Sequence, residues 1–389
     1  MTAISQRAAP SGLNRLTLAL RDLERQGAPI VDLTASNPTT ADLPYPSDYL
    51  LALAHPAATT YRPDARGLRS AREAVADALA VSTGTSVNPE RILLTTSTSE
   101  AYALLFKVLA DPGQAIAACR PSYPLIESLA RYEGLRHVPL DLEYDGDWHL
   151  SPSAIEDLAA HGPRAVCVVN PNNPTGSFLR PEARDALLAL NIPLVIDEVF
   201  APYRTEEALP SVSGLELRDG VGFVLGGLSK WAGLPQLKLS WIVWTGDDSG
   251  APIFRQLEHL ADAYLTLATP VQHAVPELLT HGASVQRAIE RRIKENLTGL
   301  RQRIRPDDPV SALRVEGGWY AVLRLPATKS DEAWALALLE QHGVRVQPGY
   351  FYDFHSGETA LVVSLLTKPA DFFSGVRRIL DLVRSEAAP

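Results

Sequence analysis

Residues 221–230 read VGFVLGGLSK, a continuous apolar run that ends in Ser229 and Lys230. Such a run is typical of a strand that is buried on both faces of a sheet. One strand–helix unit upstream, the apolar residues 194–196 end in Asp197. A lysine or a carboxylate at the end of a buried strand costs desolvation free energy unless it is paired or used in chemistry. Lys230 and Asp197 therefore indicate a site at the carboxyl ends of the predicted strands.

Similar apolar runs recur through the middle of the chain, at residues 92–94, 115–119, 165–169, 194–196, 222–225 and 239–243. Stretches with helix-start signals lie between them. Ser153 precedes residues 154–158, and Pro181 lies near the first turn of residues 182–190. This alternation predicts an α/β fold with a mostly parallel sheet and helices on both faces.

The C-terminal part of the chain, from about residue 310, has a different pattern. Residues 313–315 and 320–325 alternate as strands do, and a helix is predicted from the N-cap Ser330 to about residue 343. Further strands at 344–346 and 361–364 and a closing helix at 373–383 complete a small α+β unit. Residues 317–320, GGWY, are interpreted as a plain strand of this unit and not as a wall of the substrate site.

The composition of the chain argues against several classes of function. The 389 residues are 46% apolar and carry a net charge of −9 without any block of like charges, which argues against a nucleic-acid partner. Residues 1–7 open no apolar signal segment and no run is long enough to span a membrane, so we expect a cytoplasmic protein. Cys119 and Cys167 lie in apolar runs and are interpreted as buried thiols, and no metal site is expected.

Residues 170–176 read NPNNPTG. Asn, Pro and Gly dominate ordinary turns, but two prolines around adjacent asparagines make a rare, rigid loop that fixes a side chain. With Lys230 and Asp197, this loop supplies what a pyridoxal phosphate site needs: an amine for the aldehyde, a carboxylate for the pyridine nitrogen and a donor for the ring oxygen. On these motifs the chain resembles, from about residue 30 to its C-terminus, the fold-type I, class I/II aminotransferases of the aspartate aminotransferase superfamily.

The resemblance implies a fold-type I architecture. A large pyridoxal phosphate-binding domain, residues 46–290, would contain a mostly parallel seven-stranded sheet, and residues 1–45 and 291–389 would form a discontinuous small domain. It also implies a homodimer in which Tyr61 and residues 264–270 reach the active site of the partner subunit.

Lys230, Asp197 and Asn173 would carry the chemistry. The Lys230 amine forms an internal aldimine with the cofactor and then moves the substrate α-proton. Asp197 keeps the pyridine nitrogen protonated. The resemblance assigns Asn173 to the phenolic oxygen of the cofactor. Without a cofactor, Lys230 would be an ordinary loop lysine and Asp197 an ordinary cap.

Residues 96–100, TSTSE, supply donors for a phosphate at the start of a predicted helix. Thr98 and Ser99 are the candidates, although the same residues also make a plain N-cap. The resemblance adds Ser229, and Tyr61 from a partner subunit, to this cradle. It assigns Tyr123 to stacking on the pyridine ring.

Several positions depart from the family pattern. Lys238 stands where an arginine usually binds the phosphate, and Phe200 where a tyrosine usually donates to the ring oxygen. Val362 stands where an arginine usually binds the substrate α-carboxylate, which a valine cannot do.

The substrate is therefore expected to differ from the usual acidic amino acids. Asn37 and Arg345 are the candidate substrate-binding residues, with Lys238 and Arg66 as other cations that could bind a carboxylate.

Three functions follow from these features. The first is an aminotransferase that moves an amino group between an amino acid and a 2-oxo acid. The second is a pyridoxal phosphate-dependent decarboxylase, lyase or condensing enzyme, which the missing arginine keeps open. The third is a non-catalytic pyridoxal phosphate-binding regulator, and it is disfavoured because no DNA-binding segment is recognised before residue 30.

Overall fold

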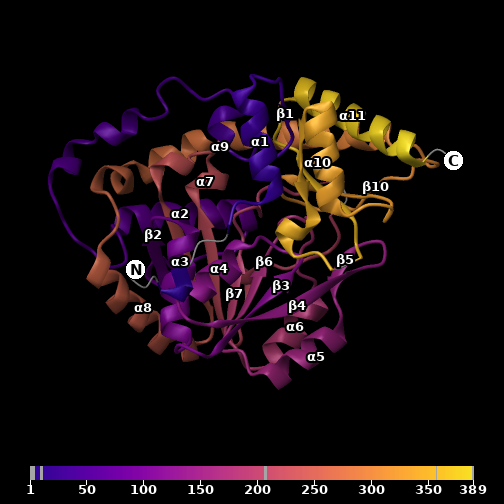
Figure 1. Cartoon of the computed structure of the whole chain (residues 1–389). Helices are drawn as coiled ribbons and strands as arrows, with labels where there is room; N and C mark the ends of the chain where they lie inside the picture. Colours follow the sequence, from indigo (N-terminus) through magenta and orange to yellow (C-terminus); the bar gives the residue numbers. More distant parts are fainter. Residues whose placement is uncertain (1–4, 9–11, 206–207, 356, 388–389) are drawn as a thin grey trace.

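The computed structural model describes residues 5–8, 12–205, 208–355 and 357–387. Its largest sheet has the strand order β2-β9-β8-β7-β6-β3-β4-β5 (Figure 1). All of these strands run in one direction except β9 and β5. Their bounds are β2 Ile92–Thr95, β3 Ala115–Arg120, β4 Arg136–Tyr144, β5 Trp148–Leu150, β6 Val166–Val169, β7 Leu194–Asp197, β8 Val221–Gly227 and β9 Ser240–Gly246. The predicted α/β class is confirmed.

The sheet has eight strands and not the expected seven, because β5 folds back on β4 as an antiparallel edge strand. Gly146, in the connecting turn, has a φ of 133°, which favours glycine. The Trp148 ring then packs at 5.1 Å from the Tyr144 ring and 6.0 Å from the Phe354 ring. The strand β4 escapes a search for apolar runs because its residues alternate between buried and exposed.

Helices cover both faces of this sheet. On one face lie α3 (Thr98–Leu109), α4 (Leu125–Tyr132) and α8 (Ala251–Tyr264), and on the other α2 (Arg69–Thr83), α5 (Pro152–His161), α6 (Pro181–Ala189) and the long α9 (Thr269–Arg303). Neighbouring residues of one strand enter different cores: Leu93 packs with the α3 side, whereas Leu94 packs with the α2 side. Burial on both faces explains the near-continuous apolar runs.

The C-terminal part forms a second sheet with the order β10-β11-β14-β13. Its strands are β10 Ser311–Ala312, β11 Tyr320–Arg324, β13 Gln347–Pro348 and β14 Ala360–Ser364, and its helices are α10 Asp331–His342 and α11 Pro369–Ala387. Ser330 caps α10, as predicted, by accepting a hydrogen bond from the Ala333 N–H.

The strand expected at residues 313–315 is wrong, because β10 ends at Ala312. The chain leaves the sheet edge there and contacts the segment that follows β7. The Thr205 N–H donates to the Glu316 carbonyl at 2.8 Å, and the Thr205 hydroxyl donates to the Val315 carbonyl.

The N-terminal elements pack against this second sheet and its helices, as Figure 1 shows by the indigo α1 near the golden α10. The helix α1 (Arg15–Arg25) contacts α10, and β1 (Val31–Asp32) pairs in parallel with β12 (Val344–Arg345). No helix in the part of the chain that the structure describes is long and apolar enough to cross a membrane.

Candidate active site

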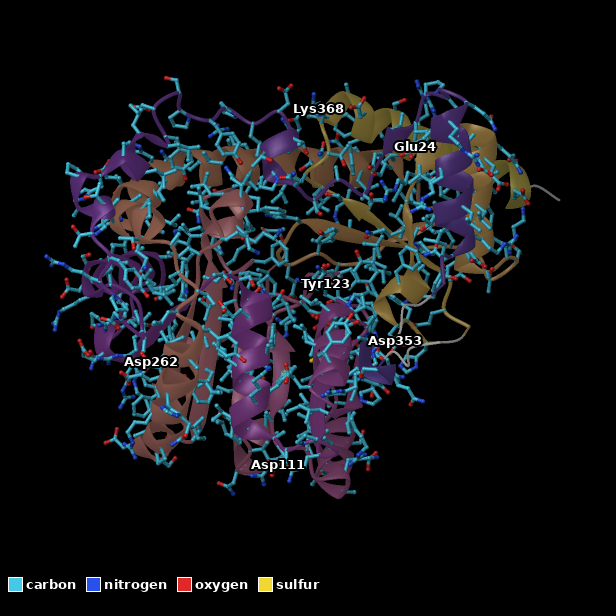
Figure 2. The ribbon with its side chains drawn as sticks, turned by 60° about the vertical axis from the view of Figure 1, so that its left-hand side comes forward. Glu24, Asp111, Tyr123, Asp262, Asp353 and Lys368 are labelled. Atoms are coloured by element: carbon cyan, nitrogen blue, oxygen red, sulfur yellow. The ribbon has the colours of Figure 1, made fainter. Side chains whose placement is uncertain are left out.

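A cavity of about 360 Å³ lies beyond the carboxyl ends of β6, β7 and β8. It is lined by residues from both sheets and has the size of a small-molecule site. Most of the predicted site residues line it: Thr98, Ser99, Tyr123, Asn173, Asp197, Ser229, Lys230 and Lys238. Figure 2 shows Tyr123 near the middle of the view, above the two magenta helices and close to Asp353.

Lys230 lies in the short helix α7 (Leu228–Trp231), which begins directly after β8. Gly227 permits this join, because a Cβ atom there would lie 2.3 Å from the Ser240 Oγ. The Lys230 Nζ lies 4.7 Å from the centroid of the Trp319 ring and 5.5 Å from that of the Phe200 ring. Burial lowers the Lys230 pKa to about 8, although the charge of Asp197 acts to raise it. A substantial share of this amine is therefore neutral near pH 8.

The Asp197 carboxylate is buried at the end of β7. Burial raises its pKa to about 6, while hydrogen bonds from the Val199 N–H and the Tyr102 hydroxyl, both at 3.1 Å, act to lower it. Asp197 is thus a buried anion at neutral pH. A protonated ring nitrogen beside it would offset part of its desolvation cost.

The asparagines of the NPNNPTG loop have different partners. Asn170 donates to Glu198 and to the Val212 carbonyl, and Asn172 donates to the Pro121 carbonyl and to Thr175. Asn173 lines the cavity, is 7% exposed, and its Oδ1 has no hydrogen-bond partner among the described residues. Of the three asparagines, Asn173 is therefore the one with an amide atom left for a ligand.

The start of α3 forms one end of the cavity. Ser97 caps the helix by accepting from the Glu100 N–H at 3.1 Å, and Glu100 in turn accepts from the N–H and the hydroxyl of Thr96. The backbone N–H groups of Thr98 and Ser99 are in the first turn, where they have no helical partner. Together with Ser229 and Lys238, this helix end suits an anion.

Two predicted substrate residues are not in this cavity. Asn37 caps a 3₁₀ turn, where its Oδ1 accepts from the Thr39 N–H at 3.0 Å and from the Thr39 hydroxyl at 2.8 Å. Arg345 pairs with Asp32 at 3.1 Å, because β1 and β12 place these residues side by side. The structure brings Ser36 and Gln347 to the cavity instead.

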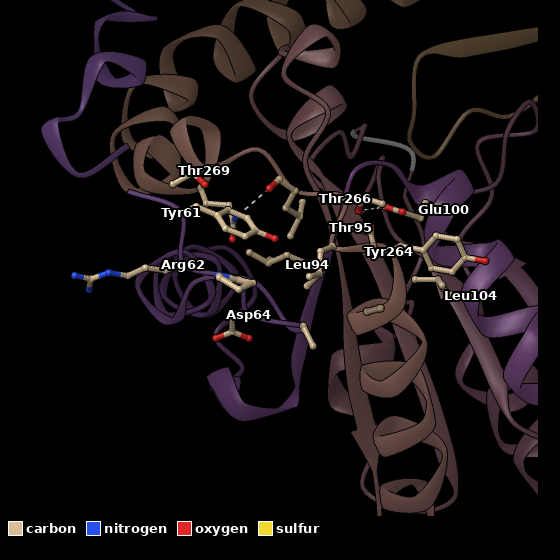
Figure 3. A pocket seen from close by; sticks show the side chains of 16 residues that line it. Tyr61, Arg62, Asp64, Leu94, Thr95, Glu100, Leu104, Tyr264, Thr266 and Thr269 are labelled. Carbon is tan, nitrogen blue, oxygen red and sulfur yellow. Dashed lines mark hydrogen bonds between the residues drawn. The ribbon is translucent and has the colours of Figure 1, made fainter. Parts of the chain in front are cut away.

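Tyr61 lies outside this cavity. It is 67% exposed and borders a separate surface pocket with Arg62, Asp64, Tyr264 and Thr266 (Figure 3). The sequence-based expectation places Tyr61 in the site of a partner subunit, and Tyr61 is not among the residues that line the Lys230 cavity of its own chain.

Several lining residues were not predicted: Ser36, Tyr102, Tyr320, Gln347 and Tyr352. The position of Tyr102 could have been predicted from the sequence, since it follows Thr98 by one helical turn and so lies on the same face of α3. The interpretation of residues 317–320 as only a plain strand is wrong, because Tyr320 lines the cavity and Trp319 packs near Lys230.

Three tyrosine hydroxyls bind backbone carbonyls of the segment that carries Lys230. Tyr203 donates to the Lys230 carbonyl at 2.5 Å, Tyr49 to the Ala232 carbonyl at 2.9 Å and Tyr45 to the Gly233 carbonyl at 2.6 Å. Burial raises the pKa of Tyr45 to about 12, so its hydroxyl remains a donor. These bonds fix the backbone of Lys230 and of the two residues that directly follow α7.

The family described as "Aminotransferase class I and II" matches residues 28–369. The glutamate-pyruvate aminotransferase AlaA of Haemophilus influenzae is 25% identical, over 92% of this chain and 94% of that protein. The arginine–pyruvate transaminase AruH of Pseudomonas aeruginosa is 26% identical, over 89% and 88%. An alanine aminotransferase from Pyrococcus furiosus superposes with a TM-score of 0.86 at 22% identity, over 98% and 100% of the two chains, which shows a shared fold.

Proposed function

Because the chain belongs to the class I and II aminotransferases, whose members use pyridoxal phosphate, we propose that Lys230, Asp197 and Asn173 hold this cofactor in the cavity described above. The protein is a transaminase, and we propose that its amino donor is a non-acidic amino acid and its acceptor a 2-oxo acid. The observation that carries the site assignment is that an amine, a buried carboxylate and an amide with an unused oxygen meet beside a donor-rich helix start.

The residues present fit the cofactor. The Asn173 Oδ1 has no hydrogen-bond partner among the described residues, so the protein does not hold this amide through its oxygen, and the Nδ2 group is the end that would donate to the ring oxygen. The first turn of α3 offers N–H groups to a phosphate. When bound, pyridoxal phosphate supplies an aldehyde for an amine and a ring that accepts electrons.

Each residue then has a defined task. The Lys230 amine anchors the cofactor and, with its lowered pKa, carries a proton to and from the substrate α-carbon. Asp197 holds a proton on the ring nitrogen. Thr98, Ser99, Ser229 and Lys238 bind the phosphate, and Tyr123 covers one face of the ring.

Phe200 has no hydroxyl to offer, although it lies within 5.5 Å of the Lys230 Nζ. Asn173 would therefore bind the ring oxygen of the cofactor without a second hydrogen bond from a tyrosine at position 200.

We propose a division into a pyridoxal phosphate-binding domain of residues 46–290 and a discontinuous small domain of residues 1–45 and 291–389. The pairing of β1 with β12 and the contact of α1 with α10 support it, because they join the two ends of the chain. We also propose a cytoplasmic location.

An amino-donor panel tests the function. We expect kcat/KM for aspartate and glutamate to be at least about 30-fold lower than for neutral aliphatic or aromatic amino acids, because no arginine is among the described residues that line the cavity to bind their second, side-chain carboxylate as an ion pair. Initial rates of 2-oxo acid formation over a range of donor concentrations give kcat/KM for each donor, and the amount of 2-oxo acid formed per donor consumed identifies the reaction type. Efficient aspartate turnover would contradict the substrate class, and release of CO₂ in place of a 2-oxo acid would favour a decarboxylase.

We propose a homodimer with composite sites. Tyr61 and Tyr264, 67% and 58% exposed, border the same surface pocket from opposite sides, and exposed aromatic residues favour a protein contact (Figure 3). Light scattering should give twice the mass of one chain. Tyr61→Phe should weaken cofactor binding by about tenfold through loss of one hydrogen bond, with Tyr132→Phe as the exposed control. A fully active monomer would refute this assembly.

A further inference from the structure

The cavity contains few groups that could bind a substrate carboxylate as an ion pair. Among the described residues that line it, Lys230 and Lys238 are the cations, and none is an arginine. The guanidinium groups of nearby arginines have other partners: Arg345 pairs with Asp32, and Arg120 binds Asp141 through two hydrogen bonds of 2.6 and 2.8 Å. Val362 is fully buried in β14, where it lies opposite Val322 and Gln347.

The second sheet presents neutral polar groups to the cavity instead. Tyr320 begins β11, Gln347 begins β13, Tyr352 follows β13, and Ser36 follows β1. Tyr320 and Tyr352 are 8% and 3% exposed, so the two tyrosines are largely shielded from water, whereas Gln347 and Ser36 are partly buried.

These neutral polar residues of the second sheet lie close to Lys230. The Tyr320 ring packs edge-on against the Phe200 ring, with the centroids 6.2 Å apart, and the same Phe200 ring lies 5.5 Å from the Lys230 Nζ. A small substrate whose amine meets Lys230 can therefore place its neighbouring substituent beside Tyr320.

The hydrogen bonds of this group leave donors available. The Tyr352 hydroxyl donates to the Gln347 Oε1, so the Nε2 group is the end of this amide that remains to donate. Burial raises the Tyr320 pKa to about 12, against the effect of a hydrogen bond with Ser36, so Tyr320 keeps its proton at neutral pH. Both groups are thus neutral donors.

We propose that Gln347 and Tyr320, held by Tyr352 and Ser36, form the subsite that binds the α-carboxylate of the amino-acid substrate through neutral hydrogen-bond donors, without an ion pair. This proposal rests on the proposed function and names how its substrate is recognised. Neutral donors bind a carboxylate only moderately more strongly than an uncharged carboxamide, whereas an arginine, which also forms an ion pair, favours the charged group far more. This subsite should therefore discriminate only weakly between a carboxylate and a carboxamide, and its affinity for the carboxylate should depend only weakly on the salt concentration.

Two probes without an α-hydrogen separate binding from turnover: 2-aminoisobutyrate and its carboxamide. Each is titrated by calorimetry into the holoprotein, where neither can be transaminated. We expect the two Kd values to agree within about tenfold. We expect the Kd of the carboxylate to change by less than about twofold between about 0.05 and about 0.5 M NaCl.

Variants of Gln347 assign the subsite. Gln347→Leu should weaken binding of both probes by about tenfold, whereas Gln341→Leu, at an exposed position of α10, should change nothing. Gln347→Arg should tighten the carboxylate alone by about tenfold or more and make its binding depend on salt. Tyr320→Phe provides an independent variant should Gln347→Leu lower the thermal stability, and it should weaken both probes without altering cofactor binding.

Unchanged binding in both Gln347→Leu and Tyr320→Phe would overturn the proposal. So would a native preference for the carboxylate of more than about a hundredfold that fades in salt, since that result requires a cation. Failure of the underlying function is recognised separately, by a holoprotein that does not carry its cofactor on Lys230.

Discussion

Replacing Lys230 by alanine should lower kcat/KM by at least about 10⁴-fold, because one amine both anchors the cofactor and carries the α-proton. Borohydride reduction of the native holoprotein should leave the mass of the cofactor on the peptide that contains Lys230. Rates are measured on the donor that the panel identifies as best.

Lys238→Ala is the matched control, since Lys238 lines the same cavity. It should retain the label at Lys230 and bind the cofactor more weakly, because it loses a phosphate contact. A label on the Lys238 peptide would contradict the assignment.

The pH dependence gives a second readout of the same amine. The lowered pKa of about 8 means that the neutral fraction of Lys230 in the cofactor-free protein rises with pH and reaches half near that value. Capture of added cofactor should accelerate up to about pH 8 and then level off, whereas an ordinary lysine would continue to gain reactivity to about pH 10.

Asp197→Ala should retain much of the cofactor and lose about 10²- to 10³-fold in kcat, because a buried charge that stabilises the transition state is removed. Stopped-flow measurement of a single half-reaction reports this loss directly. The Asp197 charge also acts to raise the Lys230 pKa, so the pH midpoint for cofactor capture should move below that of the native protein.

Tyr102→Phe is the control for Asp197. It removes one of the two hydrogen bonds to this carboxylate and leaves the charge in place, so its effect on kcat should be about tenfold or less. Near-normal turnover in Asp197→Ala would show that Asp197 is only a strand-end cap.

The sequence predicted those parts of the molecule in which local pattern and burial agree. The strands β6, β7 and β8 are buried on both faces, so their apolar runs identified them, and the residues directly after them fell at one edge of the sheet. The strands β4 and β5 were missed, because β4 is half exposed and β5 is a short hairpin partner of it.

The substrate side of the cavity could not be predicted in the same way. Gln347 and Tyr352 belong to the second sheet and the turn after β13, and they reach the cavity only because the two sheets meet there, so no local motif indicates them. Asn37 and Arg345 were plausible by residue type, but their side chains are engaged by Thr39 and Asp32, which only the folded chain reveals.

The hydroxyls of Tyr45, Tyr49 and Tyr203 give the anchor lysine a dependence on sequence far from it. Anyone who exchanges segments between this protein and a relative, or who transplants the lysine-bearing loop into another scaffold, must carry these hydroxyls along with it. A hybrid that keeps this loop but has residues 45–49 of another protein would contain every reactive group. It would nevertheless lack the Tyr45 and Tyr49 hydrogen bonds, so the position of the Lys230 amine would change. Whether a segment from a relative can replace one of this enzyme therefore depends on the hydroxyls that bind the lysine-bearing loop as much as on the residues that line the cavity.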